Sequence, residues 1–88
     1  MILSFPNPSR SYDATRHRVR FWAYDAALEI CFFVEEEALC RVDSGVPRSE
    51  GAVLDSFDLH RNRIFKAADR IYSRHSRDSY TLTASDLQ

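Results

Sequence analysis

Apolar positions recur at helical spacing over the longest patterned stretch of the chain, from Ser49 to His75. At about 100° per residue, one group of side chains falls within about 60° of the direction of Ile64. This stripe consists of Val53, Phe57, His60, Ile64, Ala67, Ala68 and Ile71. Acidic residues stand near the start of the stretch and basic residues near its end, the order that the helix dipole favours. The pattern predicts one long helix whose apolar side is wide enough to pack on a sheet.

Between His17 and Val34, two runs of alternating apolar and polar residues flank Asp25-Ala26 and predict a β-hairpin. A two-residue turn at this point fixes the register and directs the apolar residues of both strands to one face of the sheet. The predicted pairs on that face are Ala23 with Leu28, Phe21 with Ile30, and Val19 with Phe32. Ala26 is the weakest position, because a tight hairpin turn favours Gly or Asn where φ is positive, and a longer loop therefore stays open as an alternative.

Three shorter segments complete the expected architecture. Residues 35–42 carry three acids in the first turn and apolar residues behind them, which is typical of a short helix. Gly45 and Pro47 end this helix before the long one begins. Residues 80–83 alternate and have high β-propensity, which predicts a final strand. Pro6 and Pro8 make residues 1–11 an extended N-terminal arm or an edge strand.

The order of these elements defines the expected fold class. With 88 residues, the chain is predicted to form one domain, residues 1–88, of the α+β class. We expect an antiparallel sheet of three to four strands, made of the N-terminal hairpin and the C-terminal strand. A short helix and one long helix are expected to pack on one face of this sheet, in the order ββααβ.

Composition and charge narrow the classes of function. A net charge of -1 gives no overall reason to bind nucleic acid or an acidic membrane, so any such binding must come from a local patch. The sequence has no apolar run near the roughly 20 residues of a membrane span, and its start lacks the basic-then-apolar order of a secretory signal. We therefore expect a cytoplasmic protein with no membrane partner.

Candidate catalytic and metal-binding residues are few. Cys31 and Cys40 have no paired Cys or His at the spacing of zinc ligands, so we expect no metal and two free thiols, with a disulfide or redox pair as the alternative. His17, His60 and His75 do not stand beside a nucleophile and an orienting carboxylate. The two glycines of the chain cannot make a phosphate-cradling loop. We expect no catalytic site and no cofactor.

The titratable residues have structural interpretations. The position of His17 at the start of a strand directs its side chain toward the core face, where a hydrogen-bonded or rim position is a better interpretation than a ligand. His60 lies at the edge of the apolar stripe. Glu35, Glu36 and Glu37 are adjacent in a helix and point about 100° apart, so solvated charge is the better interpretation than a paired-carboxylate site.

One face of the predicted hairpin combines aromatic and basic side chains. Its candidate interface residues are Arg18, Arg20, Trp22, Tyr24 and Phe33. In so small a domain this outer face is most simply covered by the N-terminal arm or by a second copy of the chain, since exposed aromatic patches usually mark interfaces. The alternatives are a different protein partner and a nucleic acid, whose bases would stack on the aromatic rings.

A second candidate surface is a basic stripe on the long helix. Its members follow one another at spacings of three and four and are Arg63, Lys66, Arg70, Arg74 and Arg77. A run of this kind is usually a solvated helix face, and phosphate is its obvious ligand if it binds one. Leu59 points the same way as Lys66 and Arg77, which suggests a contact with the short helix or with a partner.

Several short motifs together resemble a known family. They are Phe5-Pro6-Asn7-Pro8, Ser11-Tyr12-Asp13, Val19-Arg20-Phe21, Phe32-Phe33-Val34 before Ala38-Leu39, the run from Phe57 through Arg61 and Ile64 to Tyr72, and Tyr80-Thr81-Leu82. In these positions the chain resembles the small bacterial proteins of domain-of-unknown-function family 1488. The resemblance implies an α+β fold of a sheet with helices, a bacterial cytoplasmic origin, and no catalytic motif to transfer onto these positions.

The sequence therefore predicts a non-enzymatic protein-interaction domain, most simply a homodimer through the outer hairpin face. The alternative is a nucleic-acid or anion-binding regulatory module that uses Arg18, Arg20 and Trp22 or the stripe from Arg63 to Arg77. Salt separates the two hypotheses, because phosphate binding weakens steeply as salt rises, whereas a dimer held by aromatic residues hardly responds.

Overall fold

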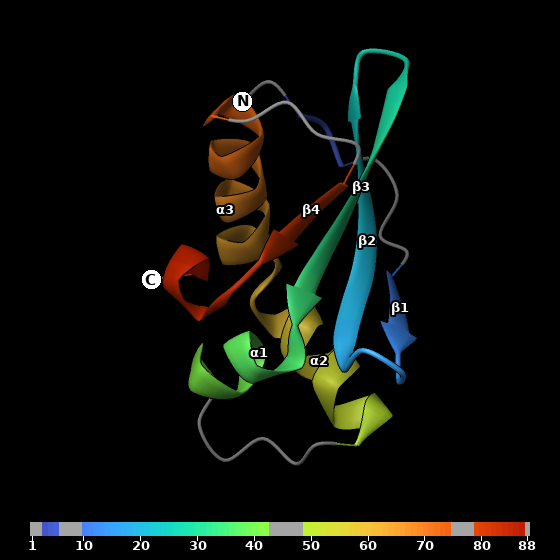
Figure 1. The fold of residues 1–88 in the computed structure, drawn as a ribbon, viewed down its shortest axis with the longest axis vertical. Helices are drawn as coiled ribbons and strands as arrows, with labels where there is room; N and C mark the ends of the chain where they lie inside the picture. Colours follow the sequence, from blue (N-terminus) through green and yellow to red (C-terminus); the bar gives the residue numbers. More distant parts are fainter. Residues whose placement is uncertain (1–2, 6–9, 43–48, 75–78, 88) are drawn as a thin grey trace.

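The computed structural model describes residues 3–5, 10–42, 49–74 and 79–87. The helices and strands of these ranges are β1 (Arg10–Asp13), β2 (Arg18–Asp25), β3 (Leu28–Glu35), α1 (Glu36–Val42), α2 (Glu50–Leu59), α3 (Arg61–Arg74), β4 (Ser79–Leu82) and the 3-10 helix η1 (Ala84–Leu87). The strands form one sheet, and the helices lie on one side of it (Figure 1). The molecule therefore has two layers, with a helix side and an outer sheet face.

The sheet has the strand order β1-β2-β3-β4. β2 is antiparallel to both β1 and β3, whereas β4 runs parallel to β3. The predicted α+β class and the order ββααβ are confirmed, with β1 as an additional edge strand. The expectation of a wholly antiparallel sheet is wrong for the last strand, because α3 carries the chain back along the sheet before β4 begins (Figure 1).

The β2–β3 hairpin has a register two residues away from the predicted one. The observed inward pairs are Ala23 with Ile30, Phe21 with Phe32, and Val19 with Val34. The turn consists of Ala26 and Ala27, and Ala26 has a φ of 55°, a conformation that is costly for a residue with a Cβ. Asp25 stays at the end of β2, where its carboxylate accepts a hydrogen bond from Tyr72 Oη at 2.6 Å. A shift of two residues keeps each side chain on its predicted face.

The predicted long helix is two helices. α2 ends at Leu59 and α3 begins at Arg61, and His60 between them has a φ of -108° and a ψ of 22°, which depart from helical values. The His60 N–H still bonds to the carbonyls of Ser56 and Phe57, so the break is a bend and not a loop. One unbroken helix over residues 50–74 would be about 37 Å long, whereas the eight-residue strands β2 and β3 span about 27 Å. The bend allows both helices to bury apolar side chains on the shorter sheet.

The core lies between the sheet and the helices. The sheet contributes buried side chains from three strands, which are Val19, Phe21, Ala23, Ile30, Phe32, Val34, Tyr80 and Leu82. The helices contribute Ala38, Leu39, Val53, Phe57, Ile64, Ala67 and Ala68. Five residues of the predicted apolar stripe are therefore buried in this core, divided over α2 and α3, and α1 adds Ala38 and Leu39.

The described N-terminal residues, 3–5, pack on the helix side of the sheet. Leu3 is buried, and its N–H donates to a carboxylate of α3 at 3.1 Å. Ser4 and Tyr24 exchange two backbone hydrogen bonds of 2.8 Å. The Phe5 ring stacks on that of Phe65 with ring centres 4.0 Å apart. These three residues do not cover the outer sheet face, and residues 6–9 of the predicted arm lie outside the described residues.

Candidate functional site

The outer face of the sheet carries the candidate interface. The predicted members Arg18, Arg20, Trp22 and Tyr24 alternate along β2, and Phe33 stands on β3 directly opposite Arg20. Cys31 lies opposite Trp22 in the same sheet. The side chains of Trp22, Tyr24 and Phe33 are each partly exposed. None of the helices that the structure describes covers this face, so the five predicted residues share one open surface (Figure 1).

Two arginines of this face lie over its aromatic rings. The guanidinium carbon of Arg18 is 3.5 Å from the centre of the Phe33 ring, and that of Arg20 is 5.1 Å from the Trp22 ring, both within the range of a cation–π contact. Arg18 Nε also donates to Asp13 Oδ2 at 3.2 Å. The charge of Arg18 is therefore balanced within the chain, whereas Arg20 is exposed and forms no ion pair with a described carboxylate.

Carboxylates stand at both ends of the outer face. Partial burial works to raise the pKa of Asp13, but hydrogen bonds from two backbone N–H groups and from Arg18 hold that pKa below its usual value. At the other end, Tyr24 Oη donates to Glu29 Oε2 at 2.9 Å, and this bond raises the pKa of Tyr24. Glu35 is exposed beside Arg18. The face is therefore mixed in charge and not uniformly basic.

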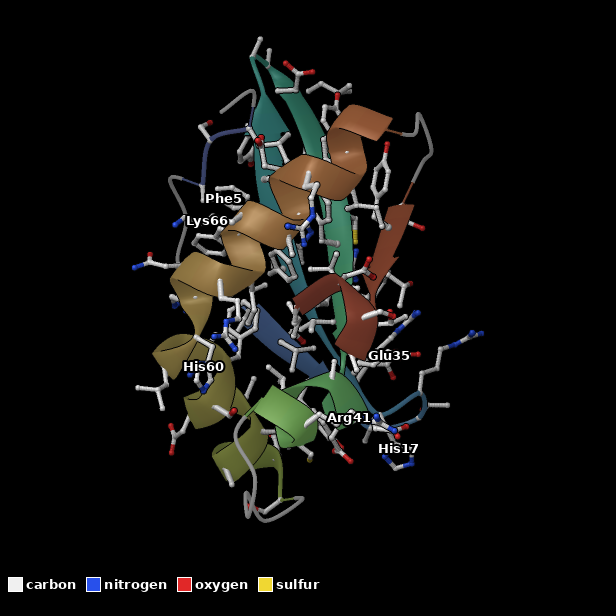
Figure 2. All side chains as sticks on the ribbon, turned by 90° about the vertical axis from the view of Figure 1, so that its left-hand side faces the viewer. Phe5, His17, Glu35, Arg41, His60 and Lys66 are labelled. Carbon is white, nitrogen blue, oxygen red and sulfur yellow. The ribbon has the colours of Figure 1, made fainter. Side chains whose placement is uncertain are left out.

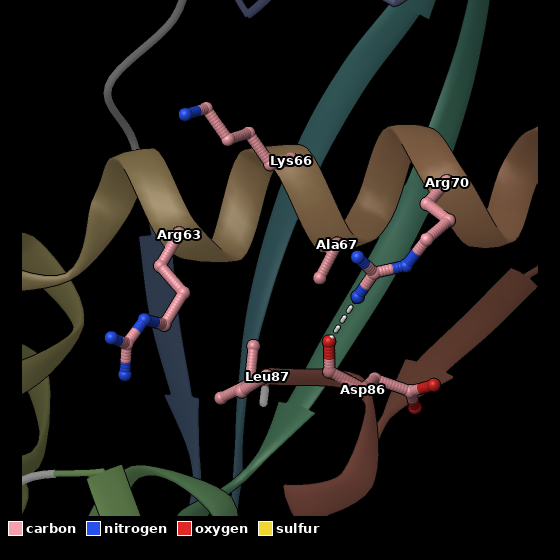
Figure 3. A pocket seen from close by; sticks show the side chains of 6 residues that line it. All are labelled: Arg63, Lys66, Ala67, Arg70, Asp86 and Leu87. Atoms are coloured by element: carbon pink, nitrogen blue, oxygen red, sulfur yellow. Dashed lines mark hydrogen bonds between the residues drawn. The ribbon is translucent and has the colours of Figure 1, made fainter.

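Part of the predicted basic stripe lies around one pocket of the structure. Three of its members line a pocket of about 290 Å³ between α3 and η1, where Arg63 and Arg70 extend toward η1 and the Lys66 ammonium extends away from it (Figure 3). The lining residues of this pocket are Arg63, Lys66, Ala67, Arg70, Asp86 and Leu87. Arg70 donates a hydrogen bond to the backbone carbonyl of Asp86. The side chain of Arg74 and the whole of Arg77 lie outside the described residues, so their place in the stripe stays a prediction.

Two interpretations of titratable residues are wrong. Glu36 is only 2% exposed, because α1 turns it toward β1, where its Oε1 accepts a hydrogen bond from Tyr12 Oη at 2.6 Å. Glu35 and Glu37, its neighbours, are exposed as predicted. His17, which was expected to point toward the core, is an exposed turn residue with a φ of 52° (Figure 2). Its backbone carbonyl accepts the Glu36 N–H at 2.9 Å.

Two further residues considered from the sequence, Leu59 and His60, lie at the junction of α2 and α3. His60 is partly buried at the bend between α2 and α3 (Figure 2). Leu59 is 72% exposed, so the suggested contact with the short helix is not made.

Cys31 and Cys40 are both free thiols. Within the described ranges, no group of His, Cys, Asp and Glu side chains is arranged to hold a metal ion. None of the described helices is both long enough and apolar enough to cross a membrane.

The 3-10 helix η1, which forms one wall of the basic pocket, was not predicted from the sequence. The Asp86 carboxylate accepts hydrogen bonds from the Thr83 N–H at 2.8 Å and from the Thr83 hydroxyl at 3.1 Å, which caps η1 and positions Leu87. The signal was present in the sequence, because Thr83 stands three residues before Asp86, the spacing of a capping box.

The fold and the site define a class of protein, a small α+β domain with an open, aromatic and mixed-charge sheet face. A family model described as protein of unknown function, DUF1488, matches residues 3–83, and the chain belongs to this DUF1488 family. The family predicted from the sequence motifs is confirmed. No curated protein matches the sequence.

A solved structure supports the same assignment. The crystal structure of a protein of unknown function from the DUF1488 family of Shewanella loihica PV-4 is similar to this chain, with a TM-score of 0.81 and 13% sequence identity. The similarity covers 92% of this chain and 91% of that chain. At this identity the comparison shows a shared fold.

Proposed function

We propose that this chain is a non-enzymatic protein-interaction domain that forms a homodimer through the outer face of its sheet. The observation that carries the proposal is the open patch of Trp22, Tyr24 and Phe33, which no described helix covers. Partly exposed aromatic side chains that lie next to one another on a face without a helix over it favour a protein interface. Aromatic residues and arginine are also the residue types that concentrate binding energy in interfaces.

The distribution of charge on this face favours a second copy of the chain as the partner. Arg20 and Glu29 stand on neighbouring strands toward opposite ends of the hairpin. Two copies stacked face to face about a two-fold axis would bring Arg20 of each copy toward Glu29 of the other. Opposite charges that meet in this way fix the register of an interface and reject wrong arrangements.

The area of the outer sheet face limits how stable the proposed dimer can be. β2 and β3 have eight residues each, and β1 and β4 have four each. At about 3.4 Å per residue and about 4.8 Å between strands, these lengths correspond to roughly 400 Å² of flat surface on each copy. Stable complexes bury about 800 Å² of accessible surface per partner. We therefore expect a dimer that dissociates on dilution and not an obligate one.

Nucleic acid is a less suitable partner for the same face. Single strands bind where aromatic rings lie in a positively charged groove. Here Arg18 is paired with Asp13, and Tyr24 donates to Glu29, so two carboxylates would meet the phosphate backbone. A cytoplasmic location is part of the proposal and is supported by the two free thiols, which are usual in reducing compartments.

Light scattering at low and high salt tests the proposal. We expect the unmodified protein to be a dimer at high concentration at both salts, and the Trp22→Ala, Phe33→Ala variant to be a monomer. Leu59→Ala is the matched control, since it removes an apolar side chain of α2 that is 72% exposed and lies on the other side of the sheet. An unmodified protein that is monomeric at high concentration, or that binds a single-stranded oligonucleotide through Trp22, would contradict the proposal.

A further inference from the structure

The pocket between α3 and η1 gathers positive charge in a concave site. Arg63, Lys66 and Arg70 follow at spacings of three and four residues on α3. Arg63 and Arg70 extend toward η1, whereas the Lys66 ammonium extends away from it (Figure 3). η1 forms the opposite wall with Leu87 and the backbone of Asp86 (Figure 3). The volume of about 290 Å³ is close to the lower end of the range for small-molecule sites.

The positive charge of this pocket is not neutralised by the residues that line it. Arg70 is held by the backbone carbonyl of Asp86, a neutral acceptor that positions the guanidinium and leaves its charge in place. The Asp86 carboxylate is engaged by Thr83 and points away from Arg63 and Lys66 (Figure 3). In the described part of the chain, neither Arg63 nor Lys66 forms an ion pair. The lining therefore holds three cations and one carboxylate.

Four of the other described arginines have carboxylate partners, whereas Arg16 and Arg20 form no ion pair with a described residue. The pairs are Arg10 and Arg61 with Asp58, Arg18 with Asp13, and Arg41 with Glu37. Like charges three or four residues apart on a helix destabilise it. A bound anion would relieve this repulsion on α3, so the uncompensated cluster points to a ligand with negative charge.

The floor of the pocket is apolar and fixed. Ala67 is 2% exposed and Leu87 is 1% exposed, so core packing holds both in place. Arginine binds phosphate oxygens with two parallel donors, and lysine binds phosphate as a point charge. Cations above a rigid apolar floor therefore suit a phosphate group that carries a small organic substituent.

We propose that this pocket binds a phosphate monoester between its two arginines, with the exposed Arg63 side chain on the phosphate and Arg70 at its edge. A terminal phosphate concentrates two charges in one pocket, whereas a nucleic-acid strand needs a longer basic track. Two guanidinium groups that face one pocket are too few to follow a strand over several phosphates. The pocket lies on the helix side, away from the proposed dimer face, so either proposal can fail without the other.

A nuclear magnetic resonance titration with phenyl phosphate at constant ionic strength tests this proposal. We expect the backbone amide signals of residues 63–70 and 84–87 to shift. The dissociation constant should rise about tenfold or more in the Arg63→Gln, Arg70→Gln variant, which loses two charge-assisted contacts. The matched control Arg16→Gln, Arg41→Gln removes the same charge from exposed side chains outside the pocket and should bind as the unmodified protein does.

The titration of the unmodified protein is decisive by itself, because it does not depend on how any variant folds. Amide signals of the pocket that do not respond to phenyl phosphate would overturn the proposal. So would equal affinity in the pocket variant and in the control variant. An oligonucleotide that shifts these signals while phenyl phosphate does not would also overturn it, in favour of a nucleic-acid site.

Discussion

Asp58 of α2 connects three elements of the fold. Its two carboxylate oxygens accept hydrogen bonds from Arg10 of β1, at 3.0 Å from Nε and 2.9 Å from Nη2. Its Oδ1 also accepts from Arg61 Nη2, at the start of α3, at 2.6 Å. The substitution Asp58→Asn therefore removes a charge from the point where the sheet edge meets both helices.

The structure limits the size of this effect. The side chains of the two ion pairs are 23% to 38% exposed, so solvent screens them. An exposed ion pair contributes about 0.2–1 kcal/mol, and the bidentate geometry places the Arg10 pair toward the upper end. We expect Asp58→Asn to lower the free energy of unfolding by about 1 kcal/mol, which is about 4–8 °C in Tm for a domain of this size.

The effect has a defined dependence on pH. Partial burial works to raise the pKa of Asp58, but the hydrogen bonds from Arg10 and Arg61 outweigh it and hold the pKa below its usual value of 3.8. Because the folded-state pKa is lower than the unfolded one, the carboxylate stabilises the fold above about pH 4. This contribution is lost as the pH falls through the folded-state pKa, so the difference between variant and unmodified protein should shrink in acid.

Urea denaturation followed by circular dichroism, at neutral pH and at about pH 3, measures this difference. Asp55→Asn is the matched control, because Asp55 is exposed on the same helix and forms no ion pair with a described residue. The control should change the free energy of unfolding by less than about 0.5 kcal/mol. Equal losses in the two variants would refute the reasoning, as would a loss at Asp58 that stays undiminished in acid.

Two further predictions concern the hairpin turn. Ala26→Gly should raise the free energy of unfolding by about 1 kcal/mol, because glycine adopts the observed φ of 55° without strain, and thermal denaturation that shows no gain would disprove this. The hydrogen bond from Tyr72 to the Asp25 carboxylate raises the pKa of Tyr72. Asp25→Asn should therefore lower the pKa of Tyr72, so that one tyrosine ionises at a lower pH in an absorbance titration. An unchanged titration curve would show that this bond is not the cause.

The composition of the outer face could be predicted because it depends on residue parity alone. Trp22 and Phe33 were assigned to the same face although the predicted register was wrong, since a shift of two residues preserves the side of each side chain. The register itself was not predictable from the turn sequence. It places Asp25 at the end of β2, where Asp25 contacts Tyr72, 47 residues away, and no local pattern signals such a contact.

Other features depended on the assembled fold. No Gly or Pro marks the bend at His60, which follows from the length of the sheet that the helices must cover. The parallel direction of β4 follows from the path of α3 across the sheet. Glu36 is buried and accepts a hydrogen bond from Tyr12 of β1, a strand whose bounds the sequence pattern did not predict. The basic pocket likewise needed η1, since α3 alone presents only a stripe.

Trp22 is the only tryptophan of the chain and lies near the middle of β2 on the proposed dimer face, so its fluorescence reports directly on that interface. The protein can be diluted from high micromolar to nanomolar concentration while its emission and its sedimentation mass are recorded together. We predict that the emission moves to longer wavelength at the concentration where the mass halves, because dissociation exposes the indole to water. Emission that stays constant while the mass halves would place the interface elsewhere, and a monomer at every concentration would contradict self-association.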